Sequence, residues 1–245
     1  MADGTPPLSP WLASSPALAS RAFGAAMELT STGERYQLRD ARLWHGVATA
    51  LTRDPHAPTP PFSAWPGVRC WWLWTRSAGA ITHLSGRRIM QRLGRREHAV
   101  VTVGAARPCV LPPPRAAGVY RVTILADTPV AVRCYGGSVV RSRPDDLSLA
   151  STLAQALAPR VIERPLRTED VAVRVLRDET TPMRSRGAPT EGPRRMAHQD
   201  GWVGLVEVEA SGLAAWLIEC AVLTGLGGRT AFGLGRVRVE VTPWS

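Results

Sequence analysis

The order of two periodic patterns in the second half of the chain constrains its fold more than any other feature. Residues 119–126, 170–177, 202–209 and 232–241 are rich in alternating apolar side chains, which predicts strands. Residues 145–158 and 211–224 repeat apolar side chains at three- and four-residue spacing, which predicts two helices. Strand, helix, strand, strand, helix, strand is the order of a ferredoxin-like domain, in which two helices back a four-stranded antiparallel sheet.

The first half predicts a similar order, with an addition. Strands are expected at 22–31, 68–74 and 99–103, and an amphipathic helix at 41–52. Residues 85–98 predict a basic helix, because Arg88, Arg92, Arg95 and Arg96 would share one helical face. We therefore expect an α+β protein of two tandem ferredoxin-like domains, 1–112 and 113–245, the first with a basic helical insertion around 85–98. The proline-rich residues 107–118 would link them.

The charge of the chain favours a nucleic-acid partner. The 245 residues carry a formal net charge of +10, and all 30 basic residues are arginine. Guanidinium groups match phosphate in a bidentate manner and stack on bases. The absence of lysine excludes a Walker A loop and Schiff-base chemistry, both of which require one.

The cysteines and the hydropathy pattern indicate a cytoplasmic protein. The four cysteines are scattered and none has CxxC spacing, and the five histidines do not complete a ligand set, so we expect no metal and no cofactor. No apolar run approaches the roughly 18 residues of a membrane helix. The start of the chain lacks a basic region followed by an apolar block, so no signal peptide is expected.

A glycine-rich stretch, TGLGGRTAFGLGRVRVEV, separates the last predicted helix from the last predicted strand. Its glycines, at 225–235, would let backbone N–H groups approach RNA phosphates, with Arg229 and Thr230 adding polar contacts. On the strand that follows, Arg236 and Arg238 share one face, and alternate valines would anchor the other face in the core.

This stretch resembles the signature of the CRISPR repeat-processing endoribonucleases of the RAMP superfamily. That signature reads G-x-G-x-x-T/S-x-x-G-F/L-G-x-hydrophobic. The matching residues in register are Gly225, Gly227, Thr230, Gly233, Leu234, Gly235 and Val237. The resemblance implies cleavage of CRISPR repeat RNA without metal or cofactor, with the protein remaining on the product hairpin. It also implies other CRISPR effector subunits as partners, and among these enzymes the chain is most similar to divergent type IV subunits.

The resemblance also implies where catalysis occurs. In many members a histidine near the first helix of the first domain takes part in catalysis, and the matching residue is His45. On the predicted helix it lies away from the apolar side, so a core position is not expected. If His45 is idle, an arginine cluster could hold the scissile phosphate instead, with a tyrosine for proton transfer. The members of that cluster are Arg35, Tyr36, Arg39 and Arg42.

The predicted RNA contacts combine the basic helix and the glycine-rich stretch. They are Arg87, Arg88, Arg92, Arg95, Arg96, Gly227, Gly228, Arg229, Thr230, Arg236 and Arg238. Residues 179–200 predict a polar, mobile loop whose arginines either order on RNA or stay solvated.

Two other functions stay open at this point. One is a noncatalytic RAMP-type subunit that binds guide RNA within a CRISPR effector complex. The other is a basic ribosomal or DNA-binding protein outside CRISPR.

Overall fold

A computed structural model describes residues 22–31, 62–66, 71–75, 85–93, 97–105, 107–133, 140–141, 143–162, 165–185, 199–228, 230 and 234–244. The described chain divides into two compact units. One contains the residues up to Leu111, and the other contains 112–228 and 234–244.

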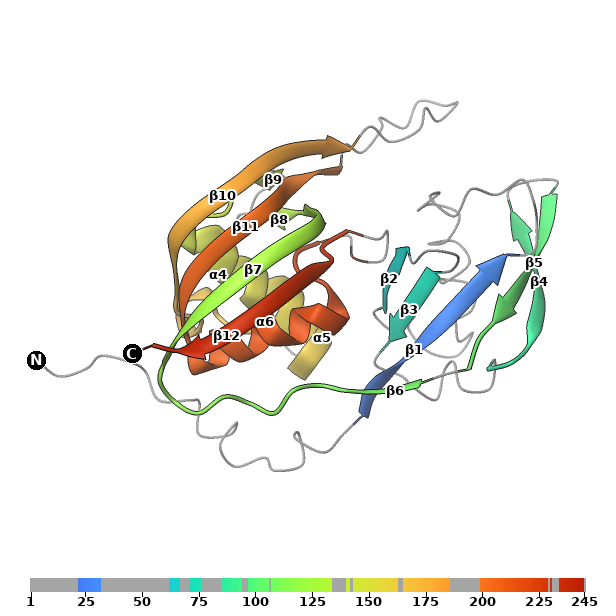
Figure 1. Ribbon diagram of the computed structural model, residues 1–245, viewed down its shortest axis with the longest axis horizontal. Helices are drawn as coiled ribbons and strands as arrows, with labels where there is room; N and C mark the ends of the chain where they lie inside the picture. The colour runs from blue at the N-terminus through green and yellow to red at the C-terminus, as the bar shows by residue number, and fades with distance from the viewer. Residues whose placement is uncertain are drawn as a thin grey trace, which may run out of the picture. The chain divides into compact units, whose positions relative to one another are not determined.

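The C-terminal unit is built on a four-stranded sheet. Its strands are β7 (Val119–Val130), β10 (Val173–Ser185), β11 (Gln199–Ser211) and β12 (Val237–Pro243). They lie in the order β10-β11-β7-β12, and every neighbouring pair is antiparallel (Figure 1). Along this path the strands are the second, third, first and fourth of the sheet in chain order. This is the ferredoxin-like arrangement, with β7 and β11 at the centre.

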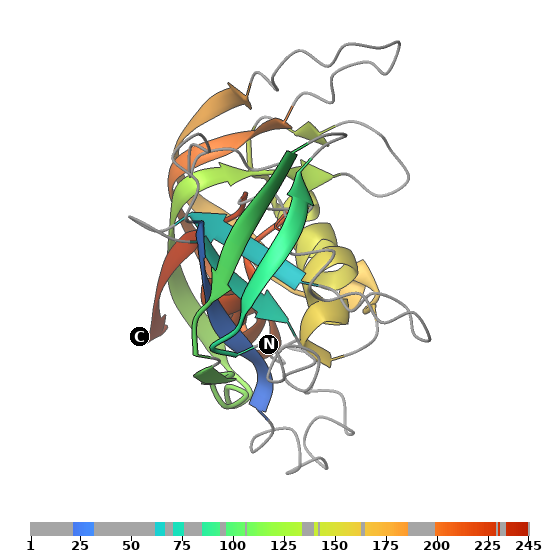
Figure 2. The ribbon, with the colours of Figure 1, turned by 90° about the vertical axis from the view of Figure 1, so that its right-hand side faces the viewer.

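The helices of this unit cover one side of the sheet (Figure 2). The first helical segment runs through α4 (Asp146–Thr152), a π-helical turn (Leu153–Leu157) and α5 (Ala158–Ile162). The second is α6 (Gly212–Thr224). Both begin at capping side chains, since Asp145 accepts the amide of Ser148 and Ser211 accepts that of Ala214. These two helices confirm the prediction from sequence.

The core of the C-terminal unit lies between the helices and the inner face of the sheet. The inward side chains of the two central strands are fully or almost fully buried: Val122, Ile124, Ala126, Val206, Val208 and Ala210. The apolar helix positions predicted from the sequence face them and are also buried: Ala150, Leu153, Ala154, Leu157, Leu213, Trp216, Leu217 and Cys220. Burial raises the pKa of the Cys220 thiol, which is therefore uncharged at neutral pH.

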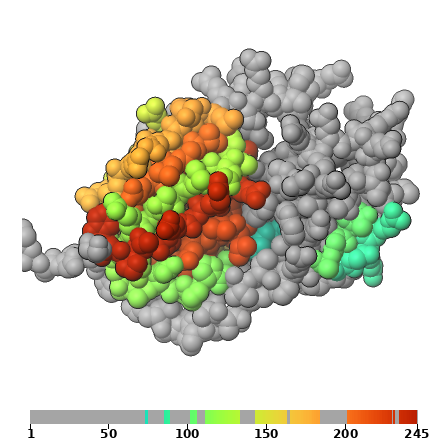
Figure 3. Space-filling view, in the orientation of Figure 1, coloured from blue at the N-terminus to red at the C-terminus, as the bar shows by residue number. Residues whose placement is uncertain are grey.

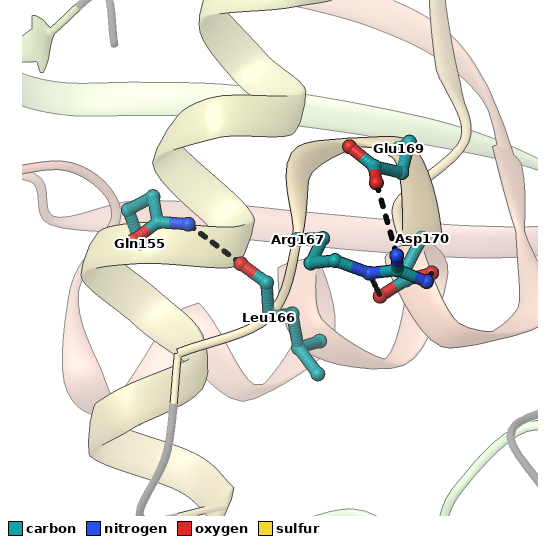
Figure 4. Close-up of polar contacts among 5 residues, drawn as sticks. All are labelled: Gln155, Leu166, Arg167, Glu169 and Asp170. Atoms are coloured by element: carbon teal, nitrogen blue, oxygen red, sulfur yellow. Dashed lines mark hydrogen bonds and ion pairs between the residues drawn. The ribbon is translucent and has the colours of Figure 1, made fainter. Parts of the chain in front are cut away.

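Polar contacts fix the segments that enter and leave the helical layer. Trp216 donates its indole N–H to the carbonyl of Pro112 at 2.7 Å, and Arg115 forms a bidentate pair with Glu219 on α6. After α5, Leu166 is tied to the first helical segment by both of its backbone groups. Its amide donates to Ala154, and its carbonyl accepts from the Gln155 side chain at 2.6 Å (Figure 4).

The N-terminal unit contains a second antiparallel sheet. Its strands are β1 (Ala22–Ser31), β2 (Phe62–Pro66), β3 (Trp71–Thr75), β4 (Arg88–Leu93), β5 (Glu97–Val103) and β6 (Arg107–Val110). The order is β2-β3-β1-β5-β4, and β6 also pairs with β1. Since β5 and β6 pair with successive parts of β1, the order parallels that of the other sheet. The predicted helix at 41–52 lies outside the described residues, so a tandem ferredoxin-like architecture stays a prediction.

The predicted basic helix at 85–98 is wrong. Its arginine-rich part is strand β4, which forms an antiparallel hairpin with β5 from Arg88 opposite Thr102 to Leu93 opposite Glu97. The arginine spacing led to the wrong prediction because residues four apart share a face in a strand as well as in a helix.

Two other sequence boundaries also change. The predicted loop at 179–200 contains paired strand at both ends, because β10 continues to Ser185 and pairs with Gln199 at the start of β11. The predicted linker begins inside the first sheet, since Arg107–Val110 is β6. In both places the polar or proline-rich composition concealed a pairing that only the partner strand determines.

The orientation of α4 can be tested by replacing its two leucines in turn. Leu149→Ala is expected to lower the free energy of unfolding by about 2–5 kcal/mol, because this side chain is 1% exposed and its loss leaves a cavity. Leu147→Ala is the matched control, expected to change it by about 0.5 kcal/mol or less, because Leu147 is 61% exposed. Urea unfolding followed by circular dichroism measures both, and equal losses would contradict the described burial.

Candidate functional site

The glycine-rich loop closes on itself and on the end of β7. At its base, the amide of Leu226 donates to the carbonyl of Gly235 at 2.8 Å. The amide of Gly228 donates to Ala131 at 2.8 Å, and that of Gly235 donates to Pro129 at 2.9 Å. The two ends of the loop are therefore joined to each other and to the chain that follows β7.

Close backbone packing explains two of the glycines. Gly227 has a φ of 86°, and a Cβ there would lie 2.6 Å from the carbonyl oxygen of Ala131. Gly235 has a φ of 75°, and a Cβ there would lie 2.0 Å from the carbonyl oxygen of Leu226. Both the positive φ and the lack of space exclude a side chain at these positions.

The same packing limits what the loop offers to a phosphate. The amides of Gly225, Leu226, Gly228 and Gly235 all donate to carbonyls of the protein. Thr230 is buried. The predicted approach of backbone N–H groups to phosphate therefore has to use groups other than these four amides.

Arg160, which sequence reasoning missed, lies at the base of this loop. Its guanidinium donates to the carbonyls of Gly227 at 2.8 Å, Gly225 at 3.2 Å and Thr224 at 3.4 Å. These carbonyls lie at and just beyond the C-terminal end of α6, where a cation is favourable. Burial lowers the pKa of Arg160 to about 10, so the side chain remains charged at neutral pH.

Arg236 directly precedes β12, and Arg238 lies on it. Arg236 and Arg238 are exposed, whereas Val237 is buried and Val239 and Val241 are half-buried on the opposite face. The backbone of Arg236 is held by Thr128, whose hydroxyl accepts its amide at 2.9 Å. Arg238 forms an ion pair with Asp127 at 2.8 Å.

Figure 3 shows the outward face of the C-terminal sheet. The charges of the described residues on this face balance. Its ion pairs are Arg121–Glu207, Arg174–Glu209, Arg177–Glu179 and Arg238–Asp127, and the exposed Arg236 and Glu240 add one charge of each sign. Among the described residues, Trp244 supplies the aromatic side chain of this face. The Arg121 guanidinium lies 5.3 Å from the centre of its ring. RNA-binding sheets stack bases on several exposed aromatic rings, so this face does not favour that mode of binding.

Several predicted site residues cannot be compared with the structure. In the N-terminal unit, Arg87 and Arg88 are exposed at the start of the β4–β5 hairpin, and Arg92 lies on β4. The candidate catalytic residues and three predicted RNA contacts lie outside the described residues: Arg35, Tyr36, Arg39, Arg42, His45, Arg95, Arg96 and Arg229. In the C-terminal unit, the structure brings Gly227, Gly228 and Arg236 together at the end of β7.

Within the described part of the chain, no cluster of histidine, cysteine or carboxylate side chains could hold a metal ion. The helices of that part are also too short or too polar to cross a membrane.

Comparison with solved structures identifies the fold. No family model matches the sequence, and no curated protein does. A Cas6 protein (TTHB231) in a product complex superposes with a TM-score of 0.59 at 18% identity, covering 89% of this chain and 100% of that one. This chain has the Cas6 fold. A second Cas6 product complex (TTHA0078) superposes with a TM-score of 0.53 at 21% identity, covering 89% and 99% of the two chains.

These superpositions confirm the fold that the resemblance of the glycine-rich stretch implied. Assignment to type IV stays a prediction, because neither structure bears on the subtype.

The packing role of the glycines gives one test. Gly235→Ala is expected to lower the free energy of unfolding by more than about 1–2 kcal/mol, because the residue has a φ of 75° and no room for a Cβ. Gly228→Ala is the matched control, since the nearest atom to its Cβ would be 3.8 Å away. Thermal unfolding measures the difference, and equal stability of the two variants would contradict the described packing.

The contacts of Arg160 give another test. Arg160→Gln is expected to cost at least about 2 kcal/mol of unfolding free energy, because three carbonyls lose a charged donor. Hydrogen exchange at the amides of Leu226 and Gly228 should accelerate, because the loop loses its hydrogen bonds to the Arg160 guanidinium. The exposed Arg167, changed to Gln, serves as control and should leave these exchange rates unchanged.

Proposed function

We propose that this chain is a metal-independent endoribonuclease that cleaves CRISPR repeat RNA in precursor transcripts and stays bound to the repeat hairpin of the product. The observation that carries the proposal is the superposition on a Cas6 product complex over 89% of this chain and the whole of the other. The glycine-rich motif supports it, because it lies between α6 and β12, where the resemblance requires it. The net charge of +10 suits a polyanionic substrate.

The proposed reaction is an internal transesterification. The 2′-oxygen upstream of the scissile phosphate forms a bond to phosphorus and gives its proton to a base. The bond to the 5′-oxygen breaks, and that oxygen takes a proton from an acid. The products are a 2′,3′-cyclic phosphate and a 5′-hydroxyl, and the developing phosphorane needs positive charge beside it.

The residues proposed for this chemistry come from the start of the chain. His45 is the proposed acid or base. Arg35, Arg39 and Arg42 would neutralise the phosphorane, and Tyr36 is the proposed proton-transfer partner if His45 is idle. These roles rest on the sequence alone.

The proposed RNA contacts change with the fold. Arg87, Arg88 and Arg92 belong to the β4–β5 hairpin rather than a helix, and Arg95 and Arg96 lie between these two strands in the sequence, outside the described residues. Such a ribbon would present its arginines to the ends or loop of an RNA hairpin, because the major groove of an RNA helix is too narrow for side chains. Arg229 and Arg236 would supply contacts from the glycine-rich loop.

Cleavage of a labelled CRISPR repeat RNA in excess EDTA tests the proposal. A single cut that leaves a cyclic phosphate is expected, and the product should stay bound in a gel-shift assay. Loss of cleavage in EDTA would overturn the mechanism. Tight binding without a cut would instead identify the noncatalytic guide-RNA subunit, and equal binding to random duplex at matched salt would place the protein outside CRISPR.

Substitution of His45 separates the two catalytic arrangements. His45→Ala is expected to reduce single-turnover cleavage by about 100-fold or more, the usual contribution of a general acid or base. His56→Ala, in the proline-rich segment that follows, is the control and should cleave normally. If His45→Ala retains full activity, catalysis must come from the arginine cluster, and Arg39→Gln and Arg42→Gln should then abolish the cut.

A further inference from the structure

A groove at the start of β7 has no part in the proposed RNA chemistry. It has a volume of about 870 Å³ and is lined by α4, the turn at 168–171, the start of β10 and the end of β11. Its apolar lining residues are Val119, Ala150, Val171, Ala172, Val173 and Ala210. The glycine-rich loop lies at the other end of β7, beyond Val130, so the groove and the loop occupy opposite ends of the same unit.

An exposed leucine borders this groove. Leu147 lines it and is 61% exposed, whereas Leu149 and Leu153 of the same helical segment are buried. The amide of Val175 donates to the Asp146 carboxylate at 2.6 Å, which holds the start of α4 against β10. Leu176, the next residue on β10, is also exposed. Leu147 therefore adds an exposed apolar side chain to the margin of the groove.

The charge of the groove has the opposite sign to that of the whole chain. Three lining residues are acidic, Asp146, Glu169 and Glu209, and one is basic, Arg174. Arg174 is paired with Glu209 at 2.5 Å. Glu169 is contacted by Arg167 at 3.3 Å, but that arginine is shared with Asp170 (Figure 4). Two carboxylates thus remain in excess on the rim of an apolar floor.

These features exclude two occupants. RNA is disfavoured, because carboxylates repel phosphate and the one lining arginine is already paired. A second copy of this chain, docked groove to groove about a two-fold axis, would bring like carboxylates together. A cationic protein segment satisfies both the carboxylates and the apolar floor.

We propose that this groove docks a short basic segment of a partner protein. Arginine or lysine side chains of the segment meet Glu169 and Asp146, and an aliphatic side chain packs against Leu147 and the apolar floor. The segment binds whether or not RNA is present, because the groove lies at the opposite end of β7 from the glycine-rich loop. This inference is independent of the proposed catalytic function.

A synthetic dodecapeptide that alternates leucine and arginine is the probe, with its binding to the full chain measured by fluorescence anisotropy. The positive net charge of the protein repels such a peptide elsewhere, so saturable binding reports an acidic surface. Glu169→Arg and Leu147→Asp should each weaken binding about tenfold, since both side chains are exposed and their substitution leaves the fold intact. Glu240→Arg, on the outward sheet face and outside the groove, is the matched control and should bind normally.

The competing occupants give distinct results. Loss of repeat-RNA binding in Leu147→Asp would show that RNA occupies the groove and would overturn the proposal. Equal binding of the peptide by all three variants, or no saturable binding, would overturn it as well. Sedimentation equilibrium of the unmodified protein tests the second copy. Self-association that Leu147→Asp abolishes would show that the groove joins two copies of this chain, and would also overturn the proposal.

Discussion

The pairing of β7 with β11 on one side and β12 on the other is the interaction on which the C-terminal unit depends. At the end of this strand, the carbonyls of Pro129 and Ala131 accept the amides that close the glycine-rich loop. At its start, Val119 lines the acidic groove and accepts the amide of Trp244. One central strand thus determines the positions of two surfaces of different chemical character.

The elements that the sequence predicts well are those with a long and unambiguous period. The helices at 146–162 and 212–224 combine a capping side chain with an apolar face, so that both signals agree. The β4–β5 hairpin was predicted wrongly as a helix, because the arginine spacing at 88 and 92 fits the period of a strand as well as that of a helix. The prediction of a loop at the far ends of β10 and β11 was wrong because the pairing of the two strands, and not the composition of either, determines where they end.

The candidate site was also predicted only in part. The glycine motif indicated the right loop, but its glycines are required by contacts with Ala131 and with Leu226, which the motif alone does not reveal. No sequence pattern distinguished Arg160, because it is one of 30 basic residues and its carbonyl partners lie 64 to 67 residues further along the chain. Sequence patterns identify residue types, whereas such contacts arise only once the chain has folded.

The balanced outward face of the C-terminal sheet has a consequence for how a polyanion meets this protein. Among the described residues, five arginines and five carboxylates lie on that face, so the net charge of +10 originates elsewhere in the chain. This face therefore offers a polyanion little net attraction, and long-range attraction has to come from charges outside it. Productive encounters would then be selected by orientation before any specific contact forms, and added salt would remove that advantage.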